Sequence, residues 1–119
     1  MLNQVQSHQL RVFIVWEPVI ETDLGPPTSF VLSRVSDPRA VQFWDKSRSL
    51  SKSMVADQEN TWLVPQGESP LSPGMIIWDF VAVFPPGAVW HSHEPPTSHC
   101  NPVVDCIERI SADVHAHVQ

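Results

Sequence analysis

The N-terminal half of the chain carries two apolar runs that predict β-strands. Residues 10–20 contain the uninterrupted run Val12–Trp16, in which β-branched and aromatic side chains follow one another without polar alternation. Such a run is typical of a strand that is buried on both faces, as in a parallel sheet, and Pro18 should end its pairing. Residues 40–44 form a second short run of the same kind.

The C-terminal half contains the longest apolar run, over residues 75–84. Two prolines and a glycine at 85–87 follow it and lead into the apolar residues 88–90. This pattern predicts a β-hairpin in which 75–84 pairs with 88–90. The preceding segment, residues 59–74, is rich in proline and glycine and is expected to be a long loop.

Helices are expected between and after these strands. Thr28 or Ser29 is a suitable N-cap for a short helix, and residues 48–58 have the spacing of a second, half-exposed helix. A third helix is predicted over about 102–114, because Asn101 is a good N-cap and apolar residues recur at helical spacing after it. The resulting order predicts one α/β domain over residues 1–119 with a mixed sheet.

Composition and charge narrow the class of protein. The chain has 119 residues, of which 12 are prolines, and a formal net charge of −6. A length near the usual size of one domain leaves no room for a second one. The acidic balance, without any basic run, argues against nucleic acid or an anionic membrane as partner. No apolar stretch approaches the roughly 20 residues of a membrane-spanning helix. The N-terminus has no features of a secretory signal, so a cytoplasmic location is expected.

Tryptophan precedes an acidic residue at three places in the predicted strands. The pairs are Trp16-Glu17, Trp44-Asp45 and Trp78-Asp79. Their spacing does not match a β-propeller repeat. Glu17 and Asp45 are therefore expected to face solvent or to cap the next element. Asp79 is flanked by apolar residues and is expected to be half-buried, with either a structural or a catalytic role.

The clearest candidate chemistry lies in the polar segment after residue 90. The candidate metal ligands are His91, His93, His99 and Cys100. Imidazole and thiolate are ligands that zinc, nickel and copper accept. The alternative interpretation is a solvated loop, because this spacing matches no established zinc motif. Cys100 lies near the start of the last predicted helix, which favours its thiolate, whereas Cys106 is expected to pack in the core.

Three sequence blocks, taken together, resemble an uncharacterised group of bacterial thioredoxin-like proteins. The blocks are residues 10–18, 37–45 and 78–90, the last followed by Pro95 and Pro96. The resemblance covers roughly residues 10–105 and implies a thioredoxin-like mixed sheet with a C-terminal hairpin and helix. In that group a strand, often a Cys-x-x-Cys turn, and a long helix precede the first block. The chain is therefore expected to be an N-terminally shortened thioredoxin-like domain.

The expected function follows from what the resemblance does not supply. No residue occupies the family's redox turn, and no other catalytic motif is recognisable, so whether the chain is an enzyme stays open. A core without its first strand and helix would expose a sheet face and an edge, which favours self-association. We expect a non-catalytic binding or assembly module that forms a homodimer or binds another protein. The alternative is a metal-binding or redox protein that uses the His91, His93, His99 and Cys100 cluster with zinc or copper.

Overall fold

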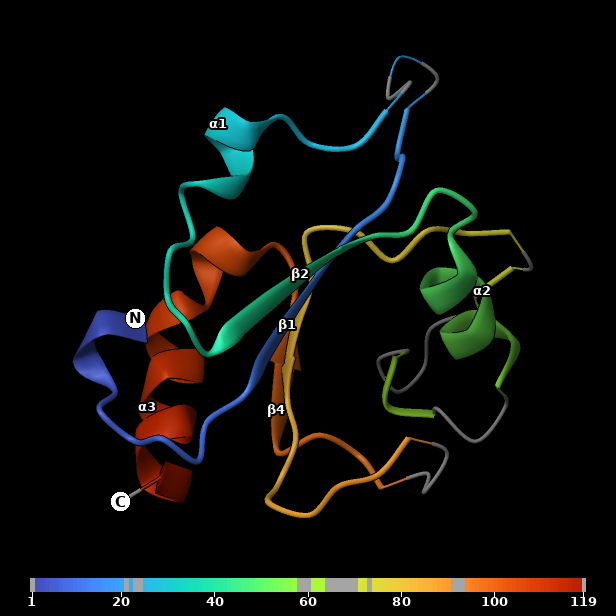
Figure 1. The fold of residues 1–119 in the computed structure, drawn as a ribbon. Helices are drawn as coiled ribbons and strands as arrows, with labels where there is room; N and C mark the ends of the chain where they lie inside the picture. Colours follow the sequence, from blue (N-terminus) through green and yellow to red (C-terminus); the bar gives the residue numbers. More distant parts are fainter. Residues whose placement is uncertain are drawn as a thin grey trace.

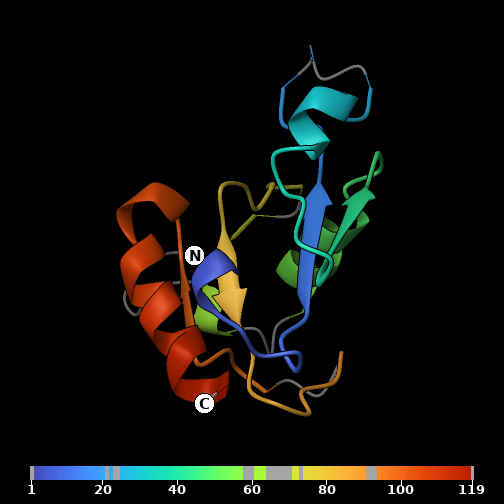
Figure 2. The same cartoon turned by 60° about the vertical axis from the view of Figure 1, so that its left-hand side comes forward.

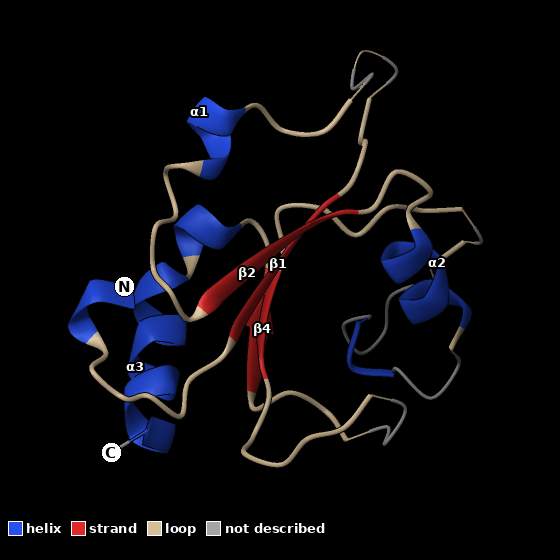
Figure 3. Ribbon diagram, viewed as in Figure 1, coloured by secondary structure: helices blue, strands red, loops and turns tan. Residues whose placement is uncertain are grey.

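The chain folds as a strand–helix–strand unit followed by a second small sheet and a C-terminal helix (Figure 1). The structure is a computed structural model that describes residues 2–20, 22, 25–57, 61–63, 71–72, 74–90 and 94–118. Figure 3 shows that loops occupy much of the chain and that the strands are short. Most of the predicted loop 59–74 lies outside the described residues; Thr61–Leu63, within it, forms the 3-10 helix η2.

The first sheet consists of β1 (Val12–Trp16) and β2 (Ala40–Trp44), which run parallel. The pairing runs from Val12 opposite Ala40 to Trp16 opposite Trp44. The indole Nε1 of Trp16 donates to Oε1 of Gln42 at 3.0 Å, so one polar side chain satisfies the indole within the sheet. Both predicted strands are present, and their β-branched and aromatic residues favour this backbone. The expected burial on both faces is wrong, because no residue of either strand is fully buried.

Two short helices flank β2 in the sequence. The connection from β1 contains α1 (Ser29–Leu32), whose N-cap Thr28 accepts a hydrogen bond from the N–H of Val31 at 3.4 Å. After β2 comes α2 (Ser49–Ala56). Its N-cap residue, Arg48, has φ of 55° and makes no side-chain cap. The capping of α2 therefore falls to residues outside its own first turn.

The second sheet pairs β3 (Val81–Val83) with β4 (Ser98–Cys100) in antiparallel orientation. The predicted hairpin between 75–84 and 88–90 is therefore wrong. Residues 88–90 are not a strand, and the N–H of Thr97 donates to the carbonyl of Val83 at 2.7 Å instead. Pro85 and Pro86 lack the N–H groups that a ladder needs, so the chain continues past residue 90 before it returns.

The C-terminal helix, α3 (Ile107–Val118), packs against β3 and β4. Figure 2 shows α3 beside β3 on one side of the molecule, with β1 and β2 on the other. The helix begins later than the predicted 102–114, because the 3-10 helix η3 (Val103–Asp105) precedes it. Ile110 and Val114 stand one helical turn apart and are 0% and 4% exposed, and Val5 is 2% exposed. These residues form the centre of the core.

The N-terminal segment is held by Arg39 at the start of β2. It contains the 3-10 helix η1 (Leu2–Gln4). The guanidinium of Arg39 donates to the carbonyls of Leu2 at 2.9 Å, Val5 at 2.6 Å and Ser7 at 3.0 Å. It also forms a salt bridge with Asp37 at 2.6 Å. Hydrogen bonds from Arg39 lower the pKa of Asp37 to about 2, so this carboxylate is charged at neutral pH.

Within the described ranges, the fold is a small mixed α/β arrangement with three α-helices and two two-stranded sheets. The α/β class is thus confirmed, but the described strands form a parallel pair and a separate antiparallel pair rather than the one mixed sheet that the sequence predicts. Among the same residues, no helix is both long enough and apolar enough to cross a membrane.

Candidate functional site

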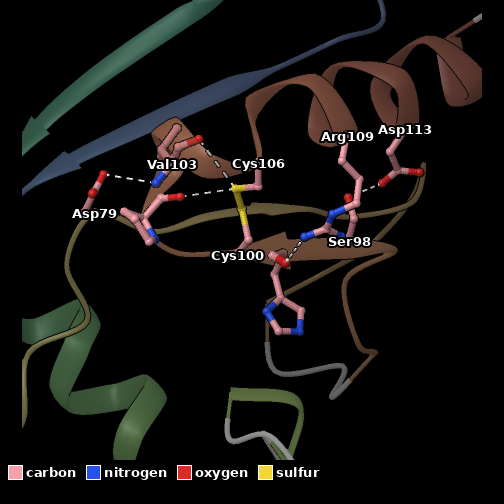
Figure 4. Close-up of a disulfide and its surroundings, with 9 residues drawn as sticks. Asp79, Ser98, Cys100, Val103, Cys106, Arg109 and Asp113 are labelled. Carbon is pink, nitrogen blue, oxygen red and sulfur yellow. Dashed lines mark hydrogen bonds between the residues drawn. A yellow bond between two sulfur atoms is a disulfide. The ribbon is translucent and has the colours of Figure 1, made fainter.

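Cys100 and Cys106 are joined by a disulfide that links the end of β4 to the start of α3 (Figure 4). Their Cα atoms are 6.5 Å apart, which is within the usual range for a disulfide. Cys106 is 9% exposed and thus lies in the core as predicted. The expectation of a free Cys100 thiolate does not hold in this state. The pairing was not anticipated because it depends on β4, which returns the chain beside the first turn of α3.

His99 is surrounded by aromatic side chains. Its ring centroid lies 5.2 Å from that of Trp62 and 6.0 Å from that of Phe80. Arg109 donates to the backbone carbonyl of His99 at 3.0 Å. Partial burial lowers the pKa of His99, and the positive charge of Arg109 lowers it further. The imidazole is therefore neutral at pH 7 and takes part in an aromatic cluster.

The predicted metal site cannot be assembled from the described part of the chain alone. His91 and His93 lie outside the described residues. His99 and Cys100 are successive residues of β4, so their side chains point to opposite faces of the strand. A disulfide sulfur is not a thiolate, so Cys100 could bind a metal only after reduction. Over the described ranges, no three His, Cys, Asp or Glu residues are grouped to hold a metal ion. The four-ligand site stays a prediction.

Asp113 on α3 anchors the helix to β4. Its Oδ2 accepts hydrogen bonds from Oγ1 of Thr97, at 2.6 Å, and from Oγ of Ser98. Partial burial alone would raise the pKa of Asp113, but these two hydroxyls, with His117 and Arg109 nearby, lower it overall. The sequence does not predict this contact. Its only signal is a polar residue on the apolar side of a helix, and that signal does not name the partner.

Glu17 and Asp45 lie just after the carboxyl ends of β1 and β2, and both cap α2. Glu17 Oε1 accepts from the N–H of Ser51 at 3.0 Å, and Asp45 Oδ2 accepts from the N–H of Leu50 at 2.8 Å. Burial alone would raise the pKa of Asp45, but hydrogen bonds from Leu50 and Ser49 lower it overall. Carboxylates are stabilised at helix N-termini. Asp45 caps the next element as predicted, whereas Glu17 caps α2 and not α1, the helix that follows β1 in sequence.

Asp79 lies in a bend, outside any strand, and is exposed. It has φ of 49°, and its Oδ1 accepts from the N–H of Val103 at 3.3 Å. The expected half-buried position is wrong, because the regular strand starts only at Val81. Asp79 therefore has a structural contact with η3.

One face of the β1–β2 sheet is apolar and open. Phe13 is 67% exposed, Val41 47% and Phe43 48%. The rings of Phe13 and Phe43 lie 6.4 Å apart. Alternation along the strands places Val15 on the same side as these three residues. We call Phe13, Val15, Val41 and Phe43 the apolar face. Parallel sheets usually have both faces covered, so such a surface suits a protein contact.

Comparisons of this chain with protein-family models, with curated proteins and with solved structures found no match.

Proposed function

We propose that the chain is a non-catalytic, thioredoxin-like assembly module that pairs with a second copy of itself through the apolar face. The observation that carries the proposal is the exposure of Phe13, Val41 and Phe43 on a parallel sheet. The order of two parallel strands, an antiparallel pair and a terminal helix supports the proposal, although the two pairs form separate sheets and the hairpin that the family resemblance implies is absent from the described residues.

A second copy fits this face because of its charge pattern. The four residues of the apolar face are uncharged, so two chains of net charge −6 can meet there without bringing carboxylates together. Arg11 and Arg39 lie at the amino end of the strand pair, and Glu17 and Asp45 lie at its carboxyl end.

A two-fold axis between the two copies would bring oppositely charged ends of the two sheets together. When the strands of the second copy run in the opposite direction, the basic end of one sheet lies against the acidic end of the other. Such an interface is isologous, since the same surface serves both subunits. Its centre would bury the two aromatic rings, which are the residue type that contributes most at interfaces.

The test is the mass of the protein in solution, measured by light scattering after gel filtration over a wide concentration range. The wild-type chain should have twice the monomer mass. Phe43→Lys should be a monomer, because it places a desolvated charge at the centre of the interface. The matched control is Phe30→Lys on α1, where the phenylalanine is 76% exposed outside the face, and it should remain a dimer.

A charge-reversal variant tests the proposed contact between the basic end of one sheet and the acidic end of the other. Arg11→Glu should weaken the dimer, and added salt should reduce the difference from wild type, since the contact is screened. A wild-type chain that is monomeric at every concentration would show that the proposed assembly is wrong. A monomeric Phe30→Lys variant would place the contact elsewhere on the chain.

A further inference from the structure

We propose that the Cys100–Cys106 disulfide is a reversible redox clasp, which a thiol reductant opens without unfolding the chain. The clasp closes residues 101–105, which contain η3 (Val103–Asp105), onto the first turn of α3. Val104 within it is 78% exposed. The closed segment is thus short, lies at the surface and contributes little to the core.

The two sulfur atoms differ in their surroundings. Cys100 is partly exposed, whereas Cys106 is 9% exposed. A reductant thiolate therefore reaches Cys100 more readily, and Cys106 is the leaving sulfur. The carbonyl oxygens of Pro102 and Val103 lie 3.4 and 3.5 Å from Sγ of Cys106 (Figure 4). Once Cys106 is a thiol, its S–H has acceptors in place and needs no rearrangement of the core.

The exchange balances with a thiol as the only co-reactant. The thiolate of the reductant, a small thiol such as glutathione, attacks Sγ of Cys100, and the bond between Cys100 and Cys106 breaks. Cys106 leaves as a thiolate and takes a proton from water. A second reductant thiol then attacks the reductant sulfur of the mixed disulfide, and Cys100 is released as a thiol. Two reductant thiols become one disulfide, and the protein gains two thiols.

The rest of the α3 contact explains why opening should stay local. Asp113 accepts from Thr97 and Ser98, and Arg109 donates to the carbonyl of His99. These contacts hold α3 to β4 one and two turns beyond the clasp, and none of them involves sulfur. Ile110, at 0% exposed, also keeps its burial. Reduction should therefore free η3 while α3 stays in place.

The experiment uses the full chain in glutathione buffers of increasing reducing power, followed by alkylation of free thiols and mass measurement. Both cysteines should become modifiable together, the helical circular dichroism should stay unchanged, and amide exchange at residues 103–105 should rise. Reduction that occurs only in denaturant would identify a purely structural disulfide and overturn the proposal. Loss of the helical signal on reduction would overturn it as well.

Two single variants test which sulfur is attacked. With oxidised glutathione, Cys106→Ser should form a mixed disulfide at Cys100 at least ~10-fold faster than Cys100→Ser forms one at Cys106, because access controls the rate. Equal or reversed rates would contradict the assigned direction of attack. Because both variants lack the disulfide, each serves as the other's control. The wild-type titration decides the proposal even if one variant does not fold.

Discussion

The two small sheets of this chain are stabilised in different ways. The β3–β4 sheet has only three residues per strand, yet α3 packs on it and is linked to it by a disulfide and by the Asp113 hydrogen bonds. The β1–β2 sheet has five residues per strand and better strand-forming residues, yet its apolar face is open. Strand length and strand propensity therefore do not decide which sheet is the better covered.

The two halves of the chain differ in whether the chain itself supplies a helix that covers the sheet. In the C-terminal half, a helix with its apolar stripe at Ile110 and Val114 supplies the second layer. In the N-terminal half, α1 has only four residues, and α2 is bound through its N-terminus to the acids that follow the strands, so neither helix covers the apolar face. The β3–β4 sheet is covered by a helix of the same chain. The β1–β2 sheet is the one that we propose is covered by a second copy.

The largest effect should come from removing the centre of the covered half. Ile110→Ala deletes a fully buried side chain, and a cavity of this kind costs roughly 2–5 kcal/mol of the free energy of unfolding. Phe13→Ala, in the open sheet, should cost only ~0.5 kcal/mol in dilute protein, since its ring is 67% exposed. Urea unfolding of both variants measures the difference.

The same pair of variants also tests the proposed assembly. If the apolar face is buried in a dimer, the cost of Phe13→Ala should grow with protein concentration, because dissociation is linked to unfolding. The difference between the losses in free energy of unfolding caused by Ile110→Ala and by Phe13→Ala should then become smaller. An equal cost for both variants in dilute protein would show that the open sheet is covered after all.

A smaller effect is expected at the contact between α3 and β4. Asp113→Ala removes the acceptor for two hydroxyls and should cost about 1–2 kcal/mol of the free energy of unfolding. Asp113→Asn keeps one acceptor oxygen in place, so it should cost less and serves as the matched control. Thermal or urea unfolding gives both values. If the two variants are indistinguishable from wild type, the disulfide and the core alone hold α3.

The comparison also explains what the sequence could predict. The runs at β1 and β2 are continuous, β-branched and aromatic, and the strands form there. In contrast, β4 is Ser98-His99-Cys100, a short polar segment without any strand pattern. Its pairing is supported by Asp113 of α3, which accepts a hydrogen bond from the hydroxyl of Ser98 and is 15 residues away from it in sequence. Local patterns carry no information about such a partner.

The candidate site shows the same contrast between features that a local pattern predicts and features that depend on distant contacts. The sequence predicts a metal site in the segment that ends at Cys100, and this stays a prediction; the disulfide shares only Cys100 with that segment and joins it to Cys106. The disulfide itself was not foreseen, because its geometry requires β4 to run back to the start of α3. The capping role of Asp45 agrees with the prediction, since an acid between a strand and a helix has a nearby donor, here Leu50. The capping role of Glu17 could not be predicted locally, because its donor Ser51 is 34 residues away in sequence.

The smallest effect concerns the segment that connects the two halves. Residues 2–7 are held by Arg39 at the start of β2, and on the other side the carbonyl of Gln4 lies 3.3 Å from Nε2 of His115 on α3. Asp37 keeps the guanidinium of Arg39 in place, and its pKa is lowered from 3.8 to about 2. A lowered carboxyl pKa stabilises the folded state above pH 3.8, and this contribution is lost as the pH falls towards 2.

Between these values, the methyl signals of Val5 in an NMR titration should shift towards those of an exposed valine. In Asp37→Asn they should already be shifted at neutral pH and should change little on acidification, because the carboxylate that titrates is gone. A variant that titrates like wild type would assign the change to other carboxylates and would remove Asp37 from the link between the open sheet and the covered one.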